Sequence, residues 1–122
     1  MLTHAEQTEL GIRLQEELDK VVAEMSSLRE GAGVVELDQT SVGRLSRMDA
    51  MQQQAMSQEL RHRAQYRFRR INAAMERQTD GRYGRCCDCA EWLSLERLRV
   101  DPAAPFCADC QSAIDLRNKA HR

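Results

Sequence analysis

Aromatic side chains are scarce in this sequence. One Trp, two Tyr and two Phe make up 4% of the 122 residues, whereas charged residues make up 30%. Such a composition is poor material for a globular core, and a chain of this length buries only a small core. The sequence therefore favours exposed helices joined to a small module.

The sequence also lacks a charge excess, a long apolar run and an export signal. Its formal net charge is -1 at pH 7, whereas a general nucleic-acid binder needs a strong positive field. No apolar run approaches the length that crosses a bilayer. Residues 1–6 have neither the basic start nor the apolar core of a signal peptide. We therefore expect a cytoplasmic protein in a reducing compartment, without membrane association or sequence-specific DNA binding.

The first predicted helix is free of proline and nearly free of glycine. From about Ala5 to Arg29 the only residue of either kind is Gly11. Apolar residues recur there in alternating steps of four and three, which is the seam of a coiled coil. They are Leu14, Leu18, Val21, Met25 and Leu28. A helix with such a seam needs a partner helix.

A second helix is predicted from about Arg44 to Gln78, where glycine and proline are again absent. Gly31-Ala32-Gly33 is expected to break the first helix, and the short connection that follows makes the two helices antiparallel neighbours. The inward candidates on the second helix are Leu45, Met48, Ala55, Leu60, Ala64, Phe68, Ile71 and Met75. The predicted fold is mainly α, with a coiled-coil hairpin over residues 1–80 and a tip loop near residues 31–43.

The two predicted helices carry opposite charges. Acidic residues outnumber basic ones in the first, whereas six arginines gather in the later half of the second. These are Arg61, Arg63, Arg67, Arg69, Arg70 and Arg77. We interpret the contrast as salt bridges across the hairpin, in preference to a stripe that binds phosphate, although one surface can do both.

Four of the five cysteines form two Cys-x-x-Cys pairs, Cys86 with Cys89 and Cys107 with Cys110, separated by seventeen residues. Two thiolates at this spacing on a tight turn can occupy adjacent corners of one tetrahedron. The pattern therefore predicts one structural Zn²⁺ ion with four sulfur ligands. Because four protein ligands leave no open coordination position, a catalytic zinc is not expected, and we predict no enzyme activity.

A disulfide or unmodified thiols are the alternatives to zinc. The cysteine count is odd, the expected compartment is reducing, and no strand-helix-strand pattern of the thioredoxin type accompanies the pairs. The fifth cysteine, Cys87, would form a Cys-x-Cys pair with Cys89, which fits the metal less well. We expect Cys87 to be a bystander or a redox-sensitive neighbour.

Residues 81–122 form the predicted zinc-finger module. Gly81 is expected to end the second helix, and Trp92, Leu93, Leu95 and Leu98 supply the apolar cover of the metal site. A short helix is predicted from Gln111 to about Ala120. Its inward candidates are Ala113, Ile114 and Leu116.

Several residues around the cysteines carry a family resemblance. Tyr83-Gly84 precedes the first pair, Arg97-Leu98 and Pro102 lie between the pairs, and a final helix follows the second pair. With the long helical hairpin, this arrangement resembles the DksA/TraR family of zinc-finger transcription factors, and its shorter paralogues in particular. The resemblance implies a bacterial regulator that binds RNA polymerase, with its coiled coil in the secondary channel and its zinc module at the channel rim.

The tip departs from the family pattern, because no stretch matches the motif Asp-x-x-Asp-x-Ala. The resemblance assigns Asp49 and Ala50 to the family's second Asp and its Ala. Asp38 is a further tip candidate, with helix capping as the alternative role. The missing tip motif affects what we can expect of the strength and sign of regulation. Binding to RNA polymerase is still expected.

Two other functions stay open at the level of sequence. Arg82, Arg85, Arg97 and Arg99, with the basic half of the second helix, make a direct nucleic-acid-binding module conceivable, which would show a steep salt dependence. The seam would also allow a self-associating coiled-coil adaptor in which zinc acts as a staple. The hairpin interpretation instead predicts a monomer.

Overall fold

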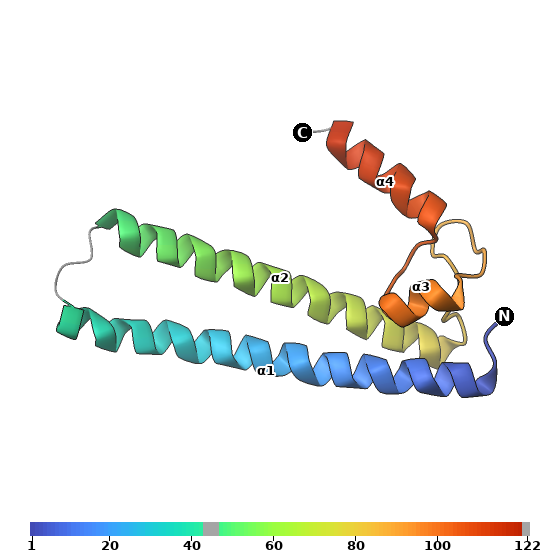
Figure 1. The fold of residues 1–122 in the computed structure, drawn as a ribbon, viewed down its shortest axis with the longest axis horizontal. Helices are drawn as coiled ribbons and strands as arrows, with labels where there is room; N and C mark the ends of the chain where they lie inside the picture. Colours follow the sequence, from blue (N-terminus) through green and yellow to red (C-terminus); the bar gives the residue numbers. More distant parts are fainter. Residues whose placement is uncertain (43–46, 121–122) are drawn as a thin grey trace. The chain divides into compact units, whose positions relative to one another are not determined.

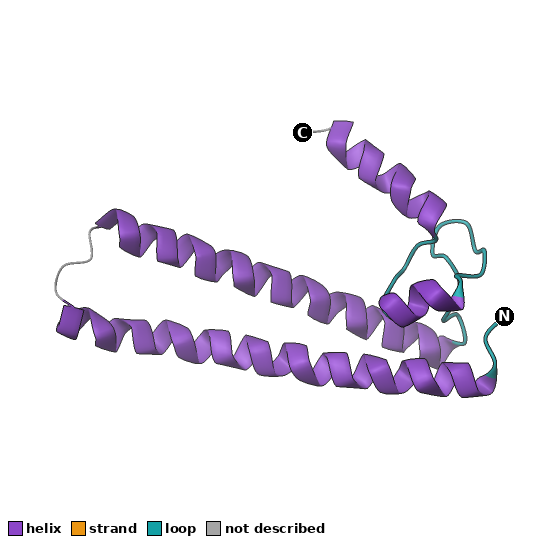
Figure 2. Ribbon diagram, in the orientation of Figure 1, coloured by secondary structure: helices purple, strands orange, loops and turns teal. Residues whose placement is uncertain are grey.

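The computed structural model describes the backbone of residues 1–42 and 47–120, and the side chains of residues 1–29 and 51–120. These described residues form four helices in succession (Figure 1). They are α1 (His4–Val42), α2 (Arg47–Asp80), α3 (Leu95–Val100) and α4 (Ala108–Ala120). The described residues are helix or loop, with no strand drawn among them (Figure 2). Their extended pairing is limited to one antiparallel bridge, Arg85 with Trp92. The mainly α fold class is confirmed.

The chain divides into two compact units. The cysteine unit contains Met1–Glu17 and Arg70–Arg122, and the hairpin unit contains Leu18–Arg69. In the cysteine unit, a Cβ atom on Gly11 of α1 would lie 3.4 Å from the Gln78 side chain of α2. In the hairpin unit, Glu24 of α1 pairs with Arg67 of α2 at 2.5 Å. Residues of α1 thus meet residues of α2 in reverse order, as in an antiparallel pair.

A capping box starts α1. The Thr3 hydroxyl accepts a hydrogen bond from the Glu6 backbone at 3.1 Å, and the Thr3 backbone N–H donates to the Glu6 carboxylate at 3.0 Å. The backbone N–H of Thr3 and, second, its side chain hold the pKa of the Glu6 carboxyl group below its usual value. The first turn is therefore fixed by two residues that lie three positions apart in the sequence.

The predicted seam of α1 is confirmed where side chains are described. Leu14 and Val21 are buried, and Leu18, Met25 and Leu28 are half-buried. Leu10, which the prediction omitted, extends the seam and is fully buried.

The predicted break at residues 31–33 is wrong. Helix α1 continues through both glycines to Val42, and the connection to α2 falls at residues 43–46, which lie outside the described part. A glycine inside a helix costs about 1 kcal/mol relative to alanine, which weakens a long helix but does not end it. The tip loop expected near residues 31–43 is therefore helical as far as Val42.

The tip candidates lie on the two helices that flank this connection. Asp38 belongs to α1, and Asp49 and Ala50 belong to the first turn of α2. The side chains of all three fall outside the described residues. Their roles stay predictions.

The inward face of α2 agrees with prediction only in its later part. Ala64 and Ile71 are buried, and Phe68 and Met75 are half-buried. Ala55 is exposed and Leu60 is 43% exposed, so these two assignments are wrong. One heptad before Ala64 stands Ser57, so the apolar stripe is interrupted by a polar residue. The side chains of Leu45 and Met48 lie outside the described residues.

Gly81 ends α2 as predicted. Its φ is +75°, and the backbone N–H groups of Arg82 and Tyr83 donate to the Arg77 carbonyl at 2.8 and 3.1 Å. A left-handed residue just after a helix allows this return of the chain, and glycine adopts that conformation most readily. The first cysteine loop therefore starts directly from the end of α2.

Helix α4 starts three residues earlier than predicted and has no buried residue. Ile114 is half-buried, whereas Ala113 is exposed and Leu116 is 68% exposed. The inward assignment is thus wrong for Ala113 and Leu116. Among the residues with described structure, no helix is long and apolar enough to cross a membrane.

Candidate metal centre

The first cysteine pair lies on a tight turn. The backbone N–H of Cys86 donates to the Glu91 carbonyl at 2.8 Å, and that of Ala90 donates to the Cys86 carbonyl at 3.0 Å. Ala90 closes the turn with a φ of +64°, a left-handed conformation that is unfavourable for a residue with a side chain. This turn brings the Cys86 and Cys89 thiols to the same place.

The second pair lies at the start of α4. Cys107 directly precedes the helix, and its sulfur accepts a hydrogen bond from the Cys110 backbone N–H at 3.4 Å. The Gln111 N–H donates to the Cys107 carbonyl at 2.9 Å and closes the first turn. Free backbone N–H groups at a helix start favour negative charge, so this position suits a thiolate.

Backbone contacts hold the two loops together. The Cys87 N–H donates to the Pro105 carbonyl at 2.8 Å, and Arg97 of α3 donates to the Phe106 carbonyl at 2.9 Å. Helix α3 is itself capped by Ser94, whose hydroxyl accepts from the Arg97 N–H at 3.2 Å. The residue just before Cys107 is therefore fixed by a neighbouring element.

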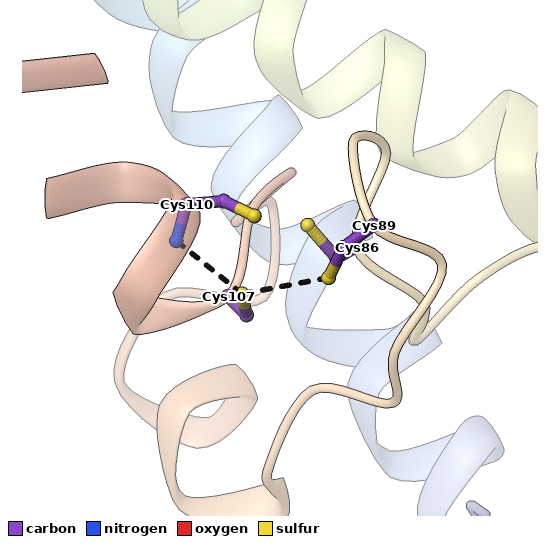
Figure 3. A group of neighbouring side chains, drawn as sticks. All are labelled: Cys86, Cys89, Cys107 and Cys110. Atoms are coloured by element: carbon purple, nitrogen blue, oxygen red, sulfur yellow. Dashed lines mark hydrogen bonds between the residues drawn. The ribbon is translucent and has the colours of Figure 1, made fainter. Parts of the chain in front are cut away.

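The four cysteine sulfurs converge. Those of Cys86, Cys89, Cys107 and Cys110 all lie within 4.8 Å of one another (Figure 3). The sulfurs of Cys89 and Cys107 are 3.8 Å apart. A tetrahedral zinc with Zn–S bonds of about 2.3 Å separates its sulfurs by about 3.8 Å. The donor set and its spacing fit one zinc ion.

The thiols differ in their preference for negative charge. Burial disfavours the Cys86 thiolate, but backbone hydrogen bonds from Cys89, Cys107 and Asp88 outweigh it and lower its pKa to about 6. The side chain of Cys107 contributes most to raising the pKa of Cys110. For Cys89 a hydrogen bond from the Glu91 backbone lowers the pKa, but desolvation and neighbouring thiols together raise it. A dication among the sulfurs favours ionisation of all four.

Cys87 is exposed and stands outside the sulfur cluster. Its position agrees with the expectation of a bystander, and its redox sensitivity stays a hypothesis.

The cover of the site comes from the residues between the two pairs. Leu93 and Leu98 are buried, as predicted, whereas Leu95 is half-buried and Trp92 is 40% exposed. Burial of Tyr83 beside the site was not predicted from the sequence. Its hydroxyl donates a hydrogen bond to the Pro102 carbonyl at 2.7 Å. The position of Leu2 against Gly84 was not predicted either.

The arginines near the four cysteines have partners within the chain, which bears on the alternative of direct nucleic-acid binding. Arg82 pairs with Asp80 at 2.7 Å, and Arg99 pairs with Glu9 at 3.4 Å. Arg97 donates to the Phe106 carbonyl, and Arg85 lies over the Trp92 ring. The polar partners of Arg82, Arg97 and Arg99 reduce what these three side chains can offer to phosphates, so the structure does not favour this alternative.

Residues 81–115 match the profile of the prokaryotic dksA/traR C4-type zinc finger. This segment of the chain is therefore similar to the DksA/TraR type of zinc finger. The C4 signature and the four clustered sulfurs agree on one structural zinc.

Relatives of known name extend the match beyond the zinc finger. The chain is 32% identical over 72 residues to the RNA polymerase-binding transcription factor DksA of Haemophilus influenzae, which covers 57% of this chain and 50% of that protein. It is 31% identical over 72 residues to the protein of the same name from Escherichia coli K12, covering 57% and 48%. The chain therefore matches about half the length of these DksA relatives.

A solved structure resembles the chain over nearly its whole length. The transcription factor DksA2 from Pseudomonas aeruginosa superposes with a TM-score of 0.76, covering 95% of this chain and 88% of that one. The sequence identity is 20%, so the comparison establishes a shared fold.

Proposed function

We propose that this DksA/TraR-type protein is a non-enzymatic transcription regulator that binds bacterial RNA polymerase. The similarity to relatives named RNA polymerase-binding transcription factors carries the proposal. The fold shared with DksA2 and the antiparallel pairing of α1 with α2 support it.

The hairpin would enter the secondary channel of the polymerase, and its end would act near the catalytic centre. Asp49 and Ala50, in the first turn of α2, are the proposed acting pair, with Asp38 of α1 as the second candidate. An acidic side chain in the first turn of a helix also stabilises that helix through the helix dipole. An experiment must therefore separate this structural role of Asp49 from its proposed action on the polymerase.

Cys86, Cys89, Cys107 and Cys110 are the proposed zinc ligands. Zinc held by four thiolates supplies a cross-link between the two loops. The turn closed by Ala90 orients the first pair, and the start of α4 orients the second. The module in turn contacts both long helices, because Arg70 of α2 pairs with Asp101 and Glu9 of α1 pairs with Arg99.

The lifetime of promoter complexes tests this proposal. Purified protein is expected to change that lifetime, and Asp49→Asn is expected to weaken the effect while polymerase binding is retained. Glu59→Gln, which removes an acid later in α2, is the matched control and should leave the effect unchanged. Wild-type protein that binds the polymerase without changing the lifetime would contradict regulation, and an unchanged effect in Asp49→Asn would contradict the tip assignment.

A further inference from the structure

Arg85 and Trp92 form an exposed stacked pair beside the metal centre. The guanidinium carbon of Arg85 lies 4.5 Å from the centre of the Trp92 ring, and Trp92 is 40% exposed. Trp92 is the only tryptophan of the chain. A large aromatic residue and an arginine thus share one exposed place on a small module.

The backbone holds this pair in position. Arg85 and Trp92 face each other in the antiparallel bridge, and hydrogen bonds of 2.8 Å flank it from Cys86 to Glu91 and from Leu93 to Gly84. Buried Cys86 and buried Leu93 are the next residues on the two strands of the turn. The pair is therefore attached to a turn that backbone hydrogen bonds and buried neighbours hold in place.

The Trp92 ring lies close to the backbone at Gly84. A Cβ atom there would be 3.6 Å from Trp92 and 2.9 Å from Leu2. The indole thus lies against the turn while Trp92 as a whole stays partly exposed. Side chains held in this way lose little conformational freedom on binding.

We propose that Arg85 and Trp92 form a preformed anchor for a carboxylate-bearing protein surface that carries apolar groups beside the acid. The inference rests on the proposed function, so that the surface belongs to RNA polymerase. A guanidinium stacked on a ring keeps its N–H edge free for a carboxylate, and the indole accepts apolar contacts. Arg and Trp are also the residue types that dominate the energetics of protein interfaces.

A protein surface fits better than a nucleic acid. Phosphate backbones are bound by several cations acting together, and the formal net charge here is -1. Two other arginines of residues 81–120, Arg82 and Arg99, already have carboxylate partners. A single arginine on an aromatic ring instead suits one acidic side chain in an otherwise mixed surface.

The test is the affinity of the full-length, zinc-loaded chain for immobilised core RNA polymerase. Arg85→Ala and Trp92→Ala are each expected to raise Kd about tenfold, as for central interface residues. Arg82→Ala is the matched control, because it removes an exposed arginine three positions away that already pairs with Asp80 at 2.7 Å. It should change Kd by less than about twofold.

Zinc content and melting temperature are measured for every variant. If Trp92→Ala loses zinc, the variants Trp92→Phe and Arg85→Gln are used in its place. They keep most of the packing and should still weaken binding to the polymerase. Kd values equal to that of Arg82→Ala in folded variants would overturn the anchor. A loss of affinity for a single-stranded oligonucleotide, with polymerase affinity unchanged, would overturn it in favour of nucleic acid. Wild-type protein without polymerase affinity would overturn the proposed function itself.

Discussion

The guanidinium of Arg70 lies 2.8 Å from the carboxylate of Asp101, and this ion pair joins α2 to the turn after α3. The other carboxylate oxygen of Asp101 accepts a hydrogen bond from the Ala103 N–H at 3.2 Å. Asp101 therefore fastens the module to the hairpin base and shapes the turn that contains buried Pro102.

Replacing Asp101 separates these two roles. Asp101→Ala removes both, and we expect a loss of about 1–2 kcal/mol in the free energy of unfolding, since both groups are partly exposed. Asp101→Asn keeps an oxygen for the Ala103 N–H and should lose about half as much. Denaturant titration measures both. Equal stability of Asp101→Ala and wild type would contradict the proposed fastening.

Substitution of a cysteine inside the sulfur cluster and of one outside it should have opposite effects on zinc binding. Cys107→Ser should lose zinc and lower the melting temperature of the cysteine unit, because metal binding in a four-cysteine site stabilises the surrounding fold. Cys87→Ser, the matched control, should retain zinc and wild-type melting because its thiol is exposed and outside the cluster. A chelator should reproduce the Cys107→Ser result. Zinc retained at full stoichiometry by Cys107→Ser would count against the ligand assignment.

Much of this site was predictable because it depends on local sequence. Two Cys-x-x-Cys turns bring their thiols together by short-range geometry, and Gly81 ends α2 by its own backbone preference. The pairing of Arg70 with Asp101 joins residues 31 positions apart and left no local pattern. The passage of α1 through Gly31 and Gly33 was missed, because a glycine lowers helix stability by an amount that the rest of a long helix offsets.

Two glycines should respond to alanine with opposite sign. Gly84 has a φ of +92°, and a Cβ atom there would meet Leu2 at 2.9 Å, so Gly84→Ala should cost about 1–3 kcal/mol. Gly11 lies inside α1, where a Cβ atom would meet the flexible Gln78 side chain at 3.4 Å. Gly11→Ala should stabilise by about 0.5–1 kcal/mol. Thermal and denaturant unfolding measure both, and a stabilising Gly84→Ala would be incompatible with the observed packing of Leu2.

Tyr83 should make stability sensitive to alkaline pH. Its burial, with a smaller contribution from Asp101, raises its pKa from the ordinary 10.0 to about 12. Because the folded state holds this proton more tightly, the stabilisation is complete below pH 10.0 and is lost as the pH rises to about 12.

The phenolate absorbance of the Tyr66→Phe variant reports this titration, since Tyr83 is then the only tyrosine. The signal should appear well above pH 10.0 in the folded protein. Titration at the ordinary value while the protein remains folded would show that the Tyr83 hydroxyl is not held as described.

The most direct measurement for the central claim is competition for purified core RNA polymerase. Labelled full-length protein, loaded with zinc, is bound to the polymerase and then challenged with a known secondary-channel factor. We predict saturable binding that the competitor displaces. Absence of binding by folded, zinc-loaded protein would contradict polymerase as the partner, and binding that the competitor leaves unchanged would contradict the secondary channel as the site.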